Sequence, residues 1–312
     1  MNIIRKLFGP AVSKIIMPAQ KKEDLYGPVR AIQRDGNVNI LNHFISAPKA
    51  SINIAEFTSA PEVPITHKKI VIFSVGNNGN YEQYFYDYVN LARENPHWHI
   101  VGFNYRNVLA SKGKAESEQD WINDAKSVIL HFRNQGCENE NILLCGHSLG
   151  GAIVTMAASQ LYQEDQHAAK TNGKNPAGVK CVRCINDRSF SNLSEEIVIS
   201  LLGHTRSSII NAVIFGVLVA SISLLWVFCF PAIGGLTILS SLNLAGITAG
   251  AVLGVSLLKD TIAYALVRPW VTMLADLTFG RMDALSQYQK IPEESKSYLI
   301  AKNDSVVKKA AS

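Results

Sequence analysis

Residues 141–157, NILLCGHSLGGAIVTMA, join two apolar runs through a Gly-x-Ser-x-Gly pentapeptide centred on Ser148. The first run, 142–145, predicts a buried strand, and the second, 151–158, predicts a close-packed helix. Glycines two residues to either side of the serine permit a very tight turn between them, because side chains there would clash with neighbouring backbone. The turn would present the serine hydroxyl at a sheet edge and at a helix N-terminus, where free N–H groups favour a developing oxyanion. The pattern therefore predicts a nucleophile elbow in preference to a purely structural turn.

Four further apolar runs predict the sheet around this elbow. They cover residues 69–75, 98–105, 178–185 and 297–301, and the elbow strand falls between the second and the third. Continuous apolar strands that alternate with helices are typical of a parallel sheet covered on both faces. Residues 19–66, with their scattered prolines and short apolar runs, predict antiparallel edge strands. We expect an α/β fold with a mostly parallel sheet, formed by residues 19–206 and 259–312.

Composition favours a folded protein with part of its surface turned away from water. Apolar residues make up 47 % of the 312 residues and charged residues only 18 %, which is lean in charge for a soluble domain. The net charge is +5, and the basic residues are scattered without interleaved aromatics, so nucleic acid is not an expected partner. The odd number of cysteines favours reduced thiols in a cytosol-like compartment. Because the Cys181-x-x-Cys184 pair lacks a second ligand pair, neither a metal nor a cofactor is expected.

Residues 207–258 form a long insertion without a charged residue. Its halves, 209–230 and 233–258, are each long enough to cross about 30 Å of hydrocarbon as a helix. We expect an apolar helical hairpin between the last two strands. It would be either a membrane hairpin, with transmembrane helices, or a pair of buried helices in a lid. The lid remains an alternative because Asn211 and Asn243 would be costly in lipid unless paired.

Residues 1–18 predict a short basic amphipathic segment. Ile3, Leu7 and Ile15 lie near helical spacing against Lys6 and Lys14, so this segment would lie on a membrane surface or pack on the body of the protein. The Gly-Pro pair at positions 9 and 10 is expected to interrupt the helix.

Residues 76–80, GNNGN, follow a predicted strand before the elbow. A Gly-rich loop at that place can direct a backbone N–H toward an oxyanion. With NYR at 104–106 and GHSLGG at 146–151, the chain resembles the α/β-hydrolase superfamily over about residues 68–200 and 285–307. DRSFSNL at 187–193 and the run 290–307 resemble the chlamydial CHLPS-type family and related lipase-like proteins secreted by intracellular bacteria. The resemblance implies Ser148 as nucleophile, Asn77 and Leu149 as oxyanion donors, and Asp304 as the acid of the triad.

The catalytic base is the open question, since the family pattern places a histidine after Asp304 and none is present. A serine hydroxyl is a poor nucleophile until a base takes its proton. Three interpretations compete: a chain truncated before its histidine, a fold that has lost catalysis, or a histidine from elsewhere, with His204 the best placed. Asp187, which follows the preceding strand, is the alternative acid. His147 is not expected to act as the base, because adjacent elbow residues point in different directions, and His43 and His131 are expected on ordinary surfaces.

These features predict a membrane-associated serine hydrolase, lipase- or esterase-like, that cleaves a lipid or another apolar ester through an acyl-Ser148 intermediate. The expected setting is a membrane facing a reducing compartment, and a secreted bacterial effector at a host membrane is compatible with it. The alternative is a catalytically inactive hydrolase-fold protein that binds a membrane or a partner.

Overall fold

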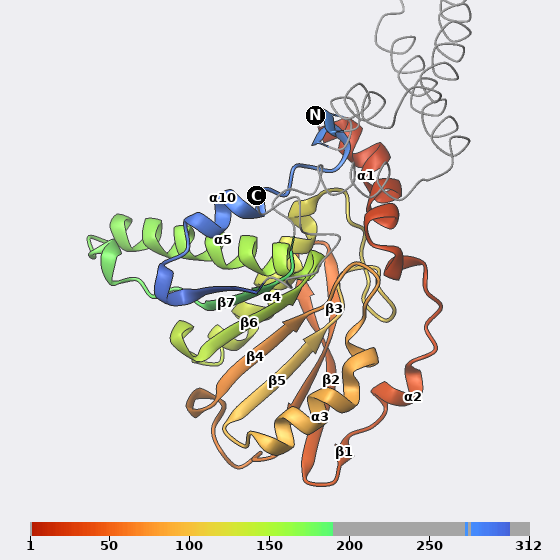
Figure 1. Cartoon of the computed structure of the whole chain (residues 1–312), viewed down its shortest axis with the longest axis vertical. Coiled ribbons are helices and arrows are strands. Elements are labelled where there is room, and N and C mark those ends of the chain that lie inside the picture. Colours follow the sequence, from red (N-terminus) through yellow and green to blue (C-terminus); the bar gives the residue numbers. More distant parts are fainter. Residues whose placement is uncertain (1, 190–271, 274–275, 300–312) are drawn as a thin grey trace, which may run out of the picture. The chain divides into compact units, whose positions relative to one another are not determined.

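The computed structural model describes residues 2–189, 272–273 and 276–299 (Figure 1). The chain divides into two compact units, Met1–Leu193 with Leu277–Ser312, and Ser194–Asp276. The described residues belong almost entirely to the first unit. The predicted insertion 207–258, His204 and Asp304 all lie outside them. Within the described residues, no helix has both the length and the apolar character needed to cross a membrane.

The first unit is built on an eight-stranded mixed sheet with the order β1-β2-β3-β5-β4-β6-β7-β8. The strands β1 to β3 and the β3–β5 pair are antiparallel, whereas β5, β4, β6, β7 and β8 run parallel. This arrangement confirms the predicted α/β fold with its antiparallel edge. The strands are β1 (Arg34–Asp35), β2 (Val38–Ala47), β3 (Ala50–Thr58), β4 (Lys69–Ser74), β5 (Trp98–Phe103), β6 (Ile142–His147), β7 (Arg183–Asp187) and β8 (Lys296–Leu299).

Helices cover both faces of the sheet (Figure 1). The helix α3 (Phe85–Glu94) packs its aromatic side chains on Phe57 of β3. On the other face, α4 (Glu118–Arg133), α5 (Leu149–Thr171) and α10 (Ala284–Gln289) contact one another. Since successive residues of a strand point to opposite faces, Phe57 faces α3 while its neighbour Glu56 faces α4, where it meets His131. A short helix α2 (Gly27–Arg30) precedes β1.

Side-chain caps fix where two of the helical segments begin. Asn80 Oδ1 accepts a hydrogen bond from Gln83 N at 3.2 Å, and Gln83 Oε1 accepts one from Asn80 N at 3.3 Å. Ahead of α4, Asp120 accepts from Ser117 N at 3.1 Å, so an aspartate takes the place that glutamate has in the usual capping box. The first cap fixes the end of the GNNGN loop.

The helix α1 (Asn2–Ile16) differs from the sequence expectation, because it continues through Pro10. The expected interruption at Gly9 and Pro10 is therefore wrong. A Cβ on Gly9 would lie 2.0 Å from the Glu116 carbonyl oxygen, so this glycine serves a close approach of α1 to the 105–118 loop. Packing of that side, with Ser13 and Ile16 buried, compensates for the one hydrogen bond that proline removes.

The strand β7 begins later than predicted. Residues 178–182 precede it, after a helical turn at Pro176–Gly178, and the strand runs two residues beyond the predicted end at 185. As a result, Asp187 is the last strand residue and pairs with His147 in the register of β6 and β7.

Candidate functional site

Ser148 lies at the junction of β6 and α5 with φ 52° and ψ −124°. A residue with a side chain rarely adopts a positive φ, and such strain is a recurrent feature of functional sites. The glycines around it are required by contact. A Cβ on Gly146 would lie 2.5 Å from the Gly150 carbonyl oxygen, and one on Gly150 would lie 2.2 Å from the Ser74 carbonyl oxygen. The turn has the geometry that the sequence predicts for an elbow, while the role of Ser148 as nucleophile stays a prediction.

The GNNGN loop lies beside the elbow. It follows β4, which pairs in parallel with β6, so both strands end at the same edge. A Cβ on Gly76 would stand 3.4 Å from Ser148 Cβ. Leu149 is the first residue of α5, and its N–H has no acceptor four residues earlier within that helix. Asn77 and Leu149 are therefore both at this edge, and their function as oxyanion donors remains a prediction. The Ser148 N–H is already used, because it donates to the Asp187 carbonyl at 2.9 Å.

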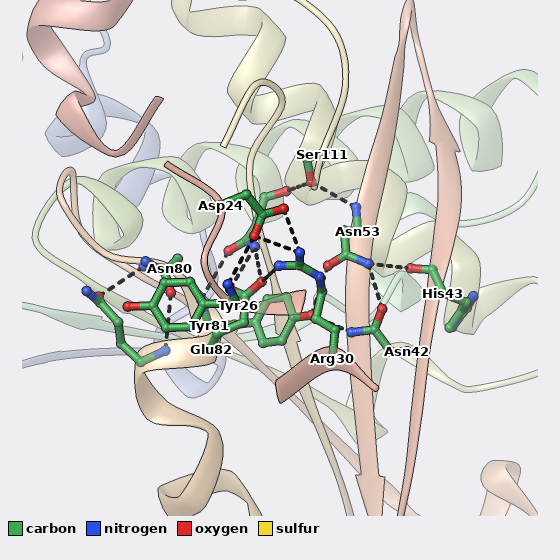
Figure 2. Close-up of polar contacts among 12 residues, drawn as sticks. Asp24, Tyr26, Arg30, Asn42, His43, Asn53, Asn80, Tyr81, Glu82 and Ser111 are labelled. Atoms are coloured by element: carbon green, nitrogen blue, oxygen red, sulfur yellow. Dashed lines mark hydrogen bonds and ion pairs between the residues drawn. The ribbon is translucent and has the colours of Figure 1, made fainter. Parts of the chain in front are cut away.

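A buried polar network supports the end of this loop (Figure 2). Tyr81 N donates to Asn104 Oδ1 at 3.1 Å. Asn104 Nδ2 donates in turn to the Glu82 carboxylate at 2.9 Å, and Arg30 pairs with the same carboxylate at 2.6 Å. Arg30 also pairs with Asp24 at 2.5 Å. These contacts anchor the residues after the GNNGN loop to the N-terminal segment.

The same network reaches the antiparallel strands through the Tyr81 hydroxyl, as Figure 2 shows. This hydroxyl donates to Asn53 Oδ1 at 2.8 Å and accepts from Asn42. Ser111 closes the network, since it accepts from Asn53 N and donates to the Asn104 carbonyl, both at 2.8 Å. Fully satisfied polar networks rigidify what they connect. Sequence reasoning missed this support, because its members come from five segments that only the fold brings together.

The N-terminal segment also touches the loop directly. Ala19 N donates to the Asn77 carbonyl at 3.3 Å, and Lys22 Nζ donates to the Asn78 carbonyl at 2.6 Å. With two of its carbonyls bound from one side, the loop is held by residues just after α1. The segment that includes α1 is thus connected to the candidate oxyanion site.

The Tyr-Arg pair at 105 and 106 lies underneath the elbow. The Tyr105 hydroxyl contacts the Ser74 hydroxyl. The Ser74 hydroxyl donates to the Gly150 carbonyl at 3.1 Å. Arg106 is fully buried and pairs with Asp124 at 2.7 Å and with Asp120 at 2.8 Å. Tyr105 therefore supports the turn, whereas Arg106 is bound to the first half of α4.

The Asp187 carboxylate is already hydrogen-bonded to two side chains, Arg188 and His147. Arg188 Nε and Nη2 donate to its two carboxylate oxygens at 2.9 and 3.0 Å, and His147 Nδ1 lies 3.0 Å from Oδ2. Burial opposes ionisation of Asp187, but the hydrogen bonds from Arg188 and His147 outweigh it and hold its pKa below the usual value. An acid whose oxygens are occupied in this way has less capacity to orient a catalytic base, which leaves Asp304 the preferred prediction.

The candidate base is absent from the described part of the site. Among the described residues, no imidazole is hydrogen-bonded to the Ser148 hydroxyl. His147 turns to Asp187, as expected from its place beside the nucleophile. His204 and Asp304 lie outside the described residues, so their roles stay predictions.

The match to known families covers this same region. A family model for lipase (class 3) matches residues 49–182, which include the elbow and the GNNGN loop. This match, together with the mixed sheet, supports an α/β-hydrolase assignment for this part of the chain. Over residues 49–182 the chain is thus similar to lipases. No curated protein sequence matches this chain significantly. The CHLPS-type resemblance therefore remains a prediction.

The solved structures to which this chain is similar are distant in sequence. An α/β-hydrolase from Vibrio vulnificus is 16 % identical with a TM-score of 0.45, over 64 % of this chain and 63 % of that one. A hyperthermophilic esterase from Pyrobaculum calidifontis is 17 % identical with a TM-score of 0.34, over 61 % and 53 %. A bacterial heroin esterase is 16 % identical with a TM-score of 0.37, over 56 % and 52 %. The chain thus spans only about half to two thirds of the length of these proteins.

Replacing Gly150 by alanine is expected to destabilise the elbow. The new methyl group would meet the Ser74 carbonyl oxygen at 2.2 Å, so strand β4 or helix α5 must shift. Overpacking against backbone should lower the free energy of unfolding by about 3 kcal/mol, measured by chemical denaturation. Gly178→Ala is the matched control, because a Cβ there has nothing within 4 Å. Equal stability of the two variants would contradict the close contact at the elbow.

Proposed function

We propose that this chain is a membrane-associated serine hydrolase that cleaves a lipid or another apolar ester through an acyl-Ser148 intermediate. The observation that supports this most strongly is the geometry at Ser148. A serine held at φ 52° between β6 and α5, with glycines that no side chain can replace, has a specific purpose only if its hydroxyl must be presented to a substrate.

The proposed reaction has two steps. Ser148 Oγ attacks the ester carbonyl while a base takes its proton, the alcohol leaves with a proton, and the acyl group stays on the serine. Water then attacks the acyl-enzyme and releases the carboxylic acid. The N–H of Leu149 and an N–H of the loop at Asn77 would stabilise the oxyanion in both steps. Asp304 with a histidine is the proposed acid–base pair, and His204 is the candidate within the chain.

The exposed side of α1 supports the membrane part of the proposal. Ile3, Leu7 and Ile15 are exposed along one side of this helix, and Lys6 and Lys14 are exposed beside them. An apolar stripe flanked by lysines matches an anionic lipid surface, which takes up the apolar side chains and attracts the cations. Since the residues just after α1 hold the GNNGN loop, lipid bound to α1 would lie next to the segment that supports the proposed oxyanion site.

Replacing Leu7 by glutamate should weaken binding to anionic vesicles at least tenfold. Leu7 is 69 % exposed, so the change removes a membrane contact worth about 1.5–3 kcal/mol without disturbing the core. Co-sedimentation with phosphatidylserine-containing vesicles measures the effect. Leu25→Glu is the control, because Leu25 is 72 % exposed but precedes α2. The same loss in both variants, or none in Leu7→Glu, would contradict the role of α1.

A fluorophosphonate probe tests the enzymatic part. Covalent labelling of the folded chain is expected, and Ser148→Ala should abolish it while circular dichroism shows the fold intact. Lipid and short-chain ester hydrolysis, followed in parallel, would then define the substrate class. Absence of serine-dependent labelling would reject the hydrolase and favour an inactive hydrolase-fold protein that binds membranes. Activity on esters is required in addition, since labelling reports only the nucleophile.

A further inference from the structure

Three histidines surround one buried glutamate on the face of the sheet that α4 covers. Glu56 Oε1 lies 2.6 Å from His43 Nε2 and 3.6 Å from His131 Nε2. Glu56 Oε2 lies 2.6 Å from His99 Nε2. His99 is the second residue of β5, and His131 is in the last turn of α4. The cluster is therefore displaced toward the amino ends of the parallel strands, whereas the elbow lies at their carboxyl ends, and the proposed ester hydrolysis makes no use of it.

Strand register brings these residues together. Glu56 pairs directly with Leu41 on β2 and with Val101 on β5. His43 and His99 each lie two residues away from those partners, so both are diagonal neighbours of Glu56 on the same face. The helix α4 then supplies its histidine from above that face. The expectation that His43 and His131 lie on ordinary surfaces is thus wrong, because it treated each histidine alone.

Glu56 lacks a permanently charged partner. Within the part of the chain that the structure describes, its ion-pair partners are imidazoles, and no lysine or arginine reaches its carboxylate. A buried carboxylate is stabilised when a cation lies beside it. A divalent cation among these groups would supply the missing positive charge.

We infer that His43, Glu56 and His131 bind a divalent transition-metal ion, for which zinc is the best match. Their ligand atoms all lie within 4.8 Å of one another. In a tetrahedral zinc site with bonds of about 2.0–2.2 Å, neighbouring ligand atoms stand about 3.3 Å apart. The separations from Glu56 Oε1 to the two imidazole nitrogens, 2.6 and 3.6 Å, bracket that value, and the nitrogens lie within 4.8 Å of each other. Movements of about 1 Å by the imidazoles would therefore complete the geometry. Two imidazoles and one carboxylate suit zinc and leave a fourth position for water.

The surroundings of the three ligands fit such a site. The His43 and His131 side chains are 28 % and 27 % exposed, which gives an ion access from solvent. His99 holds the second carboxylate oxygen, as outer-sphere groups do in metal sites. The Gln135 amide nitrogen lies 2.9 Å from His131 Nε2, and because Gln135 is exposed its side chain can turn away when the ion binds.

The ion would have a structural role. It would connect β2 and β3 to α4 at a distance from the elbow, so it stabilises the native state by binding to it alone. Removing the metal is therefore expected to lower the thermal midpoint of unfolding while the labelling of Ser148 below that temperature is unchanged. This inference does not depend on the proposed catalytic function.

Zinc titration of the full-length chain tests the inference, after removal of any affinity tag and of metal by chelation. Calorimetry and metal analysis should show one ion per chain at the cluster. His43→Gln and His131→Gln should each weaken zinc binding at least 100-fold, and His99→Gln about 10- to 100-fold. Zinc at about 100 times its Kd should raise the midpoint of unfolding by about 5 °C. Cobalt, used in place of zinc, should give the absorption bands of a tetrahedral site.

The control variants distinguish a metal site from a hydrogen-bonded cluster. His43→Gln retains a donor for Glu56, so in EDTA its unfolding midpoint should match that of the wild type. His167→Gln changes an exposed histidine of α5 and should bind zinc like the wild type. Zinc affinity that is equal in His43→Gln, His131→Gln and His167→Gln would overturn the inference, as would the absence of any zinc-dependent stabilisation.

Discussion

Replacing Ser148 by alanine is expected to lower kcat/KM for ester hydrolysis by about 10⁶-fold. The hydroxyl is the atom to which the acyl group would be transferred, and no described residue beside it offers a substitute nucleophile in the same strained turn. Alanine keeps the Cβ, so the positive φ of 52° remains equally unfavourable and the free energy of unfolding should change by less than about 0.5 kcal/mol. Steady-state kinetics and urea denaturation of the same preparation separate these two effects.

Ser148→Gly is the matched variant, because it also lacks the nucleophile but adopts the positive φ without strain. Strain of about 1–3 kcal/mol is released, and glycine loses less than about 1 kcal/mol more chain entropy on folding than alanine does. Ser148→Gly should therefore be about 1 kcal/mol more stable than Ser148→Ala while both are inactive. If Ser148→Ala retained wild-type hydrolysis, the proposed acyl-Ser148 intermediate would be wrong. If the two variants were equally stable, the strain at this residue would have no energetic consequence.

The elbow could be predicted from the sequence because all its determinants are local. Gly146, Ser148 and Gly150 lie within five residues, and the apolar runs on both sides define the strand and the helix. The loop at Asn77 was predictable for the same reason, since its position after a strand needs only the order of elements along the chain. The sequence alone could therefore predict the parallel strands and the two loops at their carboxyl ends.

The polar support and the histidine cluster could not be predicted, because they depend on the register of the antiparallel strands. A shift of one residue between β2 and β3 would turn His43 or Glu56 to the opposite face. Apolar periodicity does not define that register where polar residues are buried on both strands. For α1, local propensity at Pro10 was outweighed by the packing of Gly9 on a loop more than 100 residues away in sequence. The acid and base predictions, Asp304 and His204, lie outside the described residues and stay predictions.

Replacing Arg106 by methionine is expected to lower the free energy of unfolding by about 3–5 kcal/mol. Arg106 and Asp124 are both fully buried and joined at 2.7 Å. Removing the guanidinium leaves the carboxylate buried without its partner, and that loss is far larger than the net worth of the pair. Because the adjacent Tyr105 supports Ser74 and the Gly150 carbonyl beneath the elbow, the damage should extend to labelling of Ser148. Urea denaturation followed by circular dichroism measures the stability, and probe labelling measures the elbow.

The double variant Arg106→Met with Asp124→Leu identifies the cause, since it removes both charges and fills the space with apolar side chains. It should recover most of the lost stability, as expected when a buried ion pair is replaced as a unit. Arg133→Met is the control for loss of a guanidinium. Its partner Asp165 is 2.9 Å away, but both side chains are about one quarter exposed, so the change should cost less than about 1 kcal/mol. A loss in Arg106→Met no larger than in Arg133→Met would show that burial of the Arg106–Asp124 pair has no special effect on stability.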